Sequence, residues 1–401
     1  MPGYSSSKET VVEGSSPKEE RSRPLQGIRV LVVTSGHEAT DPRIYSKQAV
    51  SLQNLGARVT VVGKLEQGIP AEVPVQRVPT PSSRLVRFLY QPWRCLWKVR
   101  HAPADIIHFH DAEMLLPLPL ARLWWWRSRF VYDVHEDFAN LLLVQDWLPA
   151  WIKPLVRWGT QTVEKGLAAL ADAIVGVTPP LTGKFRNRQK ITVYNFPSQA
   201  FYTQAGQSQR APREREFDLV HLGTLNKRRA LFLAETLHHF HRLRPEARSL
   251  VVGVSPEIRM VLQDRLPLQT TLMGKTRYEH IPALLGNARV GLDVHPWLGA
   301  HLTVALPVKV CEYMAAGCAV VSSTMPVLQQ LLDKVRVDAD SILLLAGEEP
   351  REYAQAIVRL LKRIEQGEDP GAKLRATALT HLVWEGEVKK LARLYRQLGE
   401  K

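Results

Sequence analysis

The chain has 401 residues, of which 45% are hydrophobic, and this is enough apolar material for more than one core. The first 24 residues are rich in Ser, Glu, Lys and Pro and lack the apolar stretch of a secretory signal, so we expect a disordered tail there. No run reaches the roughly 18 apolar residues of a spanning helix. The three cysteines (Cys95, Cys311, Cys318) show no metal spacing and cannot all pair, which favours a cytoplasmic protein.

Short apolar segments alternate with helical patterns along the chain, which predicts parallel sheets covered by helices. We expect strands at 28–33, 59–62, 106–109, 130–134 and 173–177, and a second series at 217–221, 249–252, 290–294, 319–321 and 342–345. The fold class is therefore α/β with two Rossmann-like domains. We place these domains at 25–200 and 217–375, joined by a polar linker at 201–216. A C-terminal helix within 376–401 is expected to pack back on the first domain.

The loop after the first expected strand contains Gly36 and then Asp41, which is followed by Pro42. Asp41 is placed to cap a helix that begins at Pro42, so we interpret its carboxylate as a cap rather than a catalyst. Gly36 stands alone, because the G-x-G-x-x-G pattern of dinucleotide-binding loops is missing. This absence argues against a nicotinamide or flavin enzyme.

A formal net charge of +14 calls for an acidic partner. The segment Arg84–His101 interleaves cations with large apolar side chains and contains no acid, and Trp124–Trp126 lies beside further arginines. Such segments favour an anionic membrane surface, although the tryptophans could also be core residues beside a solvated basic face. Tryptophans can stack the bases of single-stranded nucleic acid, but no nucleic-acid motif accompanies the charge, so we expect no nucleic-acid partner.

Histidines and carboxylates gather where the third and fourth expected strands end. The group consists of His108, His110, Asp111, His135, Glu136 and Asp137. Open parallel sheets bind ligands at the carboxyl ends of their strands, so we expect these residues to face a site. Such donors can hold a metal. Alternating strand histidines more often serve hydrogen bonding or catalysis, and we expect no metal here.

The most informative stretch runs from Pro307 to Gly317 and is followed by an apolar strand at 319–321. Proline in the first turn and glycine at the end predict a short helix. Lys309 and Glu312 are three residues apart and therefore share one face of it. Unpaired amides at the helix start and the Lys309 charge suit a diphosphate, while the Glu312 carboxylate suits sugar hydroxyls. The pattern favours a nucleotide diphosphate ligand that carries a ribose.

Six blocks in order resemble those of family 4 glycosyltransferases with the two-domain GT-B fold. They are HEATDPRIYSKQAVSLQNLGARVTVV, ADIIHFHDAEML, FVYDVHEDF, YNFP, HLGTLNKRRAL and PVKVCEYMAAGCAVVSS. The last block is similar to the P-x-K-x-x-E-Y-M-A-x-G subset. A single block of this kind is weak evidence for the family, whereas six blocks in the same order are strong evidence. The resemblance implies sugar transfer from a nucleotide-diphosphate donor with retention of configuration and without a metal or other cofactor.

The resemblance also implies roles for single residues. It assigns donor binding to Gly36, Gly223, Arg229, Lys309 and Glu312, and contact with the reacting groups to His135, Lys309 and Arg229. Arg228 or Lys227 takes the Arg229 role if the register slips. Glu312 would hold the ribose, and the cations would hold the two phosphates. No side-chain nucleophile is evident, so we expect departure and attack on one face of the sugar, with the cations stabilising the leaving group.

Departures from the family pattern leave other functions open. Val304 stands where many members carry a second glutamate, Ala230 where glycine is favoured, and Ala319 where proline is usual. We expect a transferase that acts at the inner membrane face on a lipid-linked, glycolipid or polysaccharide acceptor. A nucleotide-sugar epimerase of the same fold and a catalytically silent binding protein are the alternatives.

Overall fold

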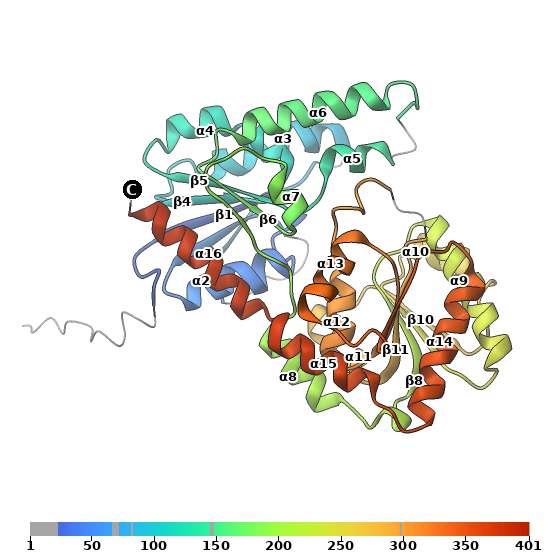
Figure 1. Ribbon diagram of the computed structural model, residues 1–401. Helices are drawn as coiled ribbons and strands as arrows, with labels where there is room; N and C mark the ends of the chain where they lie inside the picture. Colours follow the sequence, from blue (N-terminus) through green and yellow to red (C-terminus); the bar gives the residue numbers. More distant parts are fainter. Residues whose placement is uncertain (1–22, 66–71, 82, 145–147, 297–298, 401) are drawn as a thin grey trace, which may run out of the picture.

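The computed structural model describes residues 23–65, 72–81, 83–144, 148–296 and 299–400, and the tail expected at 1–24 lies almost wholly outside them. The chain forms two α/β halves, each built on one parallel sheet (Figure 1). The first sheet has seven strands in the order β3-β2-β1-β4-β5-β6-β7, and the second has six in the order β10-β9-β8-β11-β12-β13. The predicted fold class is confirmed.

The elements of the first half follow in chain order. They are β1 (Arg29–Glu38), η1 (Arg43–Ala49), α2 (Val50–Asn54), β2 (Arg58–Lys64), β3 (Val75–Arg77), α3 (Arg84–Val99), β4 (Ile106–Phe109), η2 (Ala112–Leu115), α4 (Leu118–Trp124), β5 (Arg129–Val134), α5 (Phe138–Leu143), α6 (Lys153–Ala168), β6 (Ala173–Gly176), α7 (Pro179–Gly183) and β7 (Lys190–Thr192). The Asp41 carboxylate accepts hydrogen bonds from the N–H groups of Arg43 and Ile44, at 2.9 and 3.4 Å, so it caps η1 as interpreted.

The remaining elements build the second half and return to the first. They are α8 (Gln199–Ser208), η3 (Pro212–Glu214), β8 (Phe217–Leu222), α9 (Lys227–Leu243), β9 (Ser249–Val252), α10 (Pro256–Leu262), β10 (Thr270–Met273), η4 (Tyr278–His280), α11 (Ile281–Gly286), β11 (Ala288–Asp293), α12 (Val308–Ala316), β12 (Ala319–Ser323), α13 (Pro326–Val335), β13 (Ile342–Leu345), α14 (Pro350–Glu365), α15 (Pro370–His381) and α16 (Trp384–Gly399). No helix of the described ranges is long and apolar enough to cross a bilayer.

Each expected strand is present, but three short strands were not predicted. These are β3, β7 and β10, which lie at edges of the two sheets. Their residues are half-buried or exposed. An edge strand needs no continuous apolar run, and continuous runs were the signal used to find strands.

The polar segment predicted as a linker at 201–216 contains regular structure. Residues 199–208 form α8, and its Phe201, Tyr202 and Ala205 are buried in a core cluster of the second half. The three apolar residues follow helical spacing, but polar neighbours dilute the pattern. The helix therefore gains its stability from packing rather than from its own sequence.

The C-terminal region contains the end of one helix and the whole of another, and the second is the helix expected to pack back on the first half. Residues up to His381 complete α15, where Leu374 and Ala378 pack in the second half. The chain then crosses over, and α16 lies along the first sheet (Figure 1). Trp384 begins α16, is 1% exposed, and donates its indole N–H to the Lys47 carbonyl at 3.0 Å.

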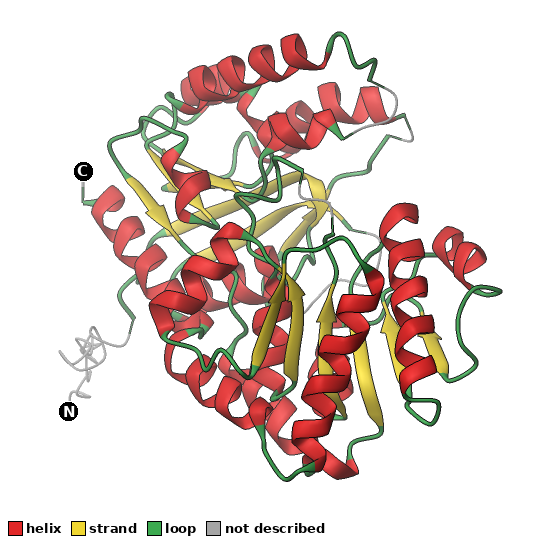
Figure 2. Cartoon of the chain, turned by 45° about the vertical axis from the view of Figure 1, so that its right-hand side comes forward, coloured by secondary structure: helices red, strands yellow, loops and turns green. Residues whose placement is uncertain are grey.

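The carboxyl ends of the strands set the position of the site. Parallel strands all end at one edge of their sheet, so the loops after β1, β4 and β5 lie together, as do those after β8 and β11. The halves meet where the Thr178 hydroxyl donates to the Val304 carbonyl at 2.7 Å. Figure 2 shows the two sheets in separate halves of the molecule, each with helices around it.

Docking of α16 predicts a strong effect of its first residue on stability. Trp384→Ala empties a buried site and removes an indole hydrogen bond, so we expect the free energy of unfolding to fall by about 3–5 kcal/mol. Urea unfolding followed by circular dichroism measures it. Trp97→Ala is the control, because that side chain is 57% exposed, and it should change stability by less than about 0.5 kcal/mol. Equal effects of the two variants would contradict the docking role.

Candidate active site

A buried carboxylate, Asp293, organises the edge of the second sheet. It ends β11 and is fully buried. Its Oδ1 atom lies 3.3 Å from Lys309 Nζ, 3.3 Å from His295 Nε2 and 4.0 Å from Arg229 Nη2. Burial alone would raise the pKa of Asp293, but the charges of Lys309 and His295 outweigh it and hold that pKa far below its usual range. Asp293 is therefore an anion that Lys309 and Arg229 share.

Lys309 lies in the first turn of α12, where the sequence placed it. Burial lowers its pKa, although the charge of Asp293 opposes the shift. Gly223 follows β8 with a φ of +106°, and an added Cβ would lie 3.2 Å from Lys309 Nζ. Glycine at this position therefore fits both the left-handed backbone and the close approach of the ammonium group.

Arg229 is held in the first turn of α9 and turns inward, unlike its two basic neighbours. The Nε atom donates to the Val294 carbonyl at 2.8 Å, and the guanidinium turns toward Asp293. Lys227 and Arg228 are exposed on the same turn. The Nη2 atom of Arg229 is buried and has no hydrogen-bond partner among the described residues. A buried guanidinium donor without an acceptor suits an incoming anion.

Glu312 lies on α12 with only 6% of its surface exposed. Burial raises its pKa, while the charge of Lys47 and the hydroxyl of Tyr278 oppose the shift. Lys47 comes from the first half and donates to Asn195 Oδ1 at 2.7 Å. Burial lowers the pKa of Lys47 to about 8, although the charge of Glu312 works against it. The structure thus places Glu312 within the electrostatic reach of both Lys309 and a cation of the other half.

His135 lies at the carboxyl end of β5, above a buried polar network. Its Nε2 atom is 2.8 Å from His110 Nδ1 and 3.6 Å from Asp133 Oδ1. Asp133 also accepts two hydrogen bonds from Arg43, at 3.0 and 3.1 Å. His108 lies 3.4 Å from Asp133 and meets the hydroxyl of Tyr395 on α16. The network fixes the His135 ring on one side.

Two of these histidines and Asp133 are close enough together to share a metal ion. Ligand atoms of His108, His110 and Asp133 lie within 4.8 Å of one another. The Arg43 guanidinium already neutralises Asp133, and His110 Nδ1 is engaged with His135. Burial lowers the pKa of both His108 and His110, so the rings are neutral partners in a hydrogen-bonded cluster.

Gly36, which the sequence placed in a loop after the first strand, lies within β1 near its carboxyl end. The N–H groups of Ser35 and Gly36 donate to Asp111 Oδ2 at 2.7 and 3.1 Å. His37 lies 2.6 Å from the other oxygen of this carboxylate. The Gly36 amide, expected to approach a phosphate, thus already has an anionic partner. A Cβ at Gly36 would lie 2.9 Å from Asp111 Oδ1, so only glycine fits without a shift.

The structure gathers the predicted residues into two groups. Gly223, Arg229 and Lys309 surround Asp293, with Glu312 close by, while Gly36 and His135 lie on the first half. Burial lowers the pKa of His301 in the second half, and the charge of Glu136 in the first half opposes this shift. Sequence reasoning missed Asp293, His295 and Lys47. The strand-end rule that it applied to the first sheet points equally to Asp293 and His295 at the end of β11.

The predicted membrane segments form the outer face of the first half. On α3, Cys95, Leu96 and Val99 face the core, while Trp97 is 57% exposed. Of Trp124–Trp126, Trp125 is buried and Trp126 is 73% exposed. A groove of about 860 Å³ lies between these helices and is lined by Trp93, Trp97, Trp124, Arg77, Arg94 and Lys98 among others. The surface combines exposed aromatic rings with cations.

Family comparisons agree with this architecture. Residues 25–193 match the model "Glycosyl transferase 4-like domain", and residues 216–363 match "Glycosyl transferases group 1". The two matches cover both halves, in the order that the fold requires. The chain belongs to the GT-B glycosyltransferases. Comparison with curated proteins gives no match.

Solved structures of the same fold resemble this glycosyltransferase over nearly its whole length. Sucrose-phosphate synthase from Thermosynechococcus elongatus aligns with a TM-score of 0.69 and 16% identity, over 92% of this chain and 99% of that one. Anabaena HepE in complex with UDP-glucose gives 0.65 and 14%, over 92% and 99%. A trehalose 6-phosphate synthase from Burkholderia multivorans gives 0.58 and 14%, over 92% and 96%.

The His37–Asp111 pair predicts a pH-dependent contribution to stability. The hydrogen bond that the His37 ring donates to Asp111 raises the pKa of His37 from 6.5 to about 9. The pair therefore stabilises the folded chain fully below the unfolded value of 6.5 and loses this effect as the pH rises through about 9. Because the side chain is 39% exposed, we expect only about 0.5 kcal/mol.

Urea unfolding of the parent and of His37→Ala, at pH values on either side of this window, measures the contribution. The difference between the two proteins should shrink at the higher pH. His101→Ala is the control, because His101 is exposed and forms no salt bridge among the described residues. An unchanged difference would show that His37 is not charged by Asp111.

Proposed function

We propose that this glycosyltransferase moves a sugar from a nucleotide-diphosphate donor to a lipid-linked, glycolipid or polysaccharide acceptor, with retention of configuration. The observation that carries the proposal is the convergence of Lys309, Arg229 and His295 on Asp293, beside the glycine turn at Gly223. Clustered cations at a helix start fit two phosphates. The placement of Glu312 on the same helix supports its role toward the ribose.

The proposed mechanism uses these charges at the moment when the sugar leaves. Negative charge grows on the nucleotide diphosphate, and Lys309 and Arg229 stabilise it most strongly at that point. Asp293 keeps both cations in place before the donor binds. Departure and attack occur on the same face of the sugar, and the acceptor hydroxyl passes its proton toward the leaving phosphate. His135, held on Asp133 and His110, would contact the donor sugar or its phosphate.

We further propose that the donor is a UDP-sugar and that the reaction requires no metal ion. Anabaena HepE was solved with UDP-glucose, so UDP-sugars come first among the candidate donors. The cations around Asp293 supply the charge that a metal ion would otherwise bring to a diphosphate. We therefore propose turnover that chelators leave unchanged.

The outer face of the first half supports the acceptor proposal. Exposed Trp97 and Trp126 lie beside cations, and α3 and α4 contain no acid. Aromatic rings anchor at lipid headgroups, while basic side chains attract anionic lipids. We propose peripheral binding at the cytoplasmic face of the membrane, through residues 84–101 and 124–126, where a lipid-linked acceptor would be presented.

Val304 favours a second candidate, a catalytically silent binding protein. Many relatives are expected to carry a glutamate at this position, but here the valine packs at the edge of the apolar core of the first half. A panel of nucleotide sugars separates the possibilities. Release of nucleoside diphosphate that needs acceptor supports transfer, acceptor-free isomerisation of the sugar indicates an epimerase, and binding without turnover indicates the silent protein.

Single substitutions test the assigned cations. Removing a positioned, charged donor costs about 3 kcal/mol of transition-state stabilisation, so Lys309→Ala and Arg229→Ala should each reduce turnover about a hundredfold. Lys227→Ala is the matched control, because Lys227 is exposed on the same turn as Arg229. Initial rates at saturating donor measure the effect. A folded Lys309 or Arg229 variant within about threefold of the parent would remove that residue from the mechanism.

Flotation with liposomes tests membrane binding. We expect the protein to float with vesicles that contain anionic phosphatidylglycerol at low salt, and to be released at high salt because the attraction is screened. The double variant Trp97→Glu/Trp126→Glu should lose most of this binding, since it removes two anchors and adds two negative charges. Leu268→Glu, a change at a fully exposed apolar residue of the second half, should float like the parent. Failure of the parent to float would refute the membrane proposal.

A further inference from the structure

The second sheet ends in β10 on one side and in β13 on the other. In the described part of the chain β13 pairs only with β12. The Ser341 and Leu345 carbonyls accept hydrogen bonds from the β12 side, at 3.2 and 2.8 Å. Backbone groups alternate along a strand, so the N–H and C=O groups of Ile342 and Leu344 point away from the sheet. Such an edge is a template for another strand.

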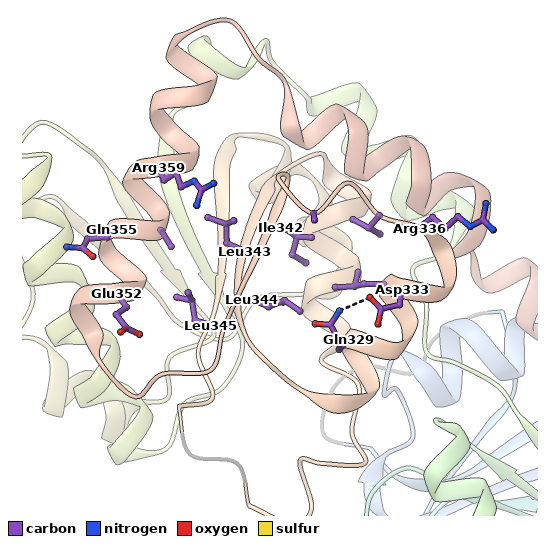
Figure 3. Close-up of a pocket in the computed structure, with 14 residues that line it drawn as sticks. Gln329, Asp333, Arg336, Ile342, Leu343, Leu344, Leu345, Glu352, Gln355 and Arg359 are labelled. Carbon is purple, nitrogen blue, oxygen red and sulfur yellow. Dashed lines mark hydrogen bonds between the residues drawn. The ribbon is translucent and has the colours of Figure 1, made fainter.

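A groove of about 850 Å³ lies along this edge between α13 and α14. Figure 3 shows β13 in the middle, with Leu343 and Leu345 turned toward α14 and Ile342 and Leu344 turned toward α13. Leu343, Leu344 and Leu345 are each only half-buried, unlike the wholly buried residues of β12. An apolar strand is thus left partly exposed at the rim of the sheet.

The charges on the rim of the groove are arranged in a regular way. Arg336 and Arg359 lie near its Ile342 end, and Asp333 and Glu352 lie nearer its Leu345 end (Figure 3). Each flanking helix region therefore contributes one acid and one base. All four residues are exposed. Asp333 accepts a hydrogen bond from Gln329, but none of the four has an ion-pair partner among the described residues.

We infer that the β13 edge is the interface of a two-fold symmetric dimer of this chain, in which the two β13 strands pair antiparallel. A two-fold axis places the same patch of both copies face to face in opposite directions. The basic end of one groove then meets the acidic end of the other. Glu352 faces Arg359 of the second copy, and Asp333 faces its Arg336. The rim is therefore complementary to itself.

The spacing of the charged residues supports a second copy of the chain as the partner at this edge. Glu352 and Arg359 are seven residues apart on α14, or about 10 Å along the helix, with Gln355 and Ala356 midway between them. Leu343 occupies the corresponding middle of β13 in Figure 3, so one axis serves both elements. Strands in a sheet lie about 4.8 Å apart and packed helices about 8–10 Å apart. A sheet that continues across the edge is thus compatible with flanking helices that pack against their symmetry mates.

Sedimentation velocity over a range of protein concentrations tests the inference, with a dimer expected in the micromolar range. Glu352→Arg and Arg359→Glu should each weaken the dimer about tenfold or more, because each creates two like-charge contacts across the axis. The double variant Glu352→Arg/Arg359→Glu should restore association to within about threefold of the parent, since the swap re-creates both contacts. The matched control is Glu235→Arg/Arg242→Glu, with the same spacing on the exposed face of α9, and it should have no effect.

Hydrogen exchange gives a second readout that does not depend on charge. The Leu344 amide should exchange slowly at concentrations where the dimer forms and rapidly in the Glu352→Arg variant. A parent that stays monomeric would overturn the inference. So would a dimer that neither single variant weakens, or one that the double swap fails to restore.

Discussion

A buried cation is stable only beside a counter-charge, and the candidate active site depends on this constraint. Lys309 and Arg229 are largely removed from water, which would favour loss of the Lys309 proton. Asp293, fully buried at the end of β11, supplies the shared negative charge that keeps the cluster together. The arrangement is a cluster of cations that Asp293 holds in fixed positions before any anion arrives. Preorganised charge of this kind is what stabilises a leaving diphosphate.

In the first half, another buried aspartate likewise holds several polar side chains in place. Asp133 is fully buried and shared by Arg43, Gln48 and the histidines below His135. Through His108 this network also reaches Tyr395 on α16. The last helix of the chain therefore contacts the hydrogen-bonded network that positions His135. Docking of α16 therefore fixes both the covering of the first sheet and part of the polar network beneath its carboxyl edge.

Several departures from the family pattern acquire a physical explanation in the structure. Val304 lies against apolar side chains and gives its carbonyl to Thr178 of the other half, so this position contributes to the contact between halves rather than to a charged site. Ala230 is fully buried against the second sheet. The Asp111 carboxylate accepts hydrogen bonds from the Ser35 and Gly36 amides near the end of β1, so its charge is balanced within the first half.

The sequence by itself determined the two parallel sheets, the helix that presents Lys309 and Glu312, and the cap at Asp41, because these follow from local periodicity and turn chemistry. It also indicated which strand ends carry histidines and carboxylates. Only the tertiary structure decided that Asp293 joins Lys309 to Arg229, that Lys47 crosses to the region of Glu312, and that α8 is a core helix. These contacts join residues far apart in the chain, and their energies come from burial and shared charge, which no local pattern records.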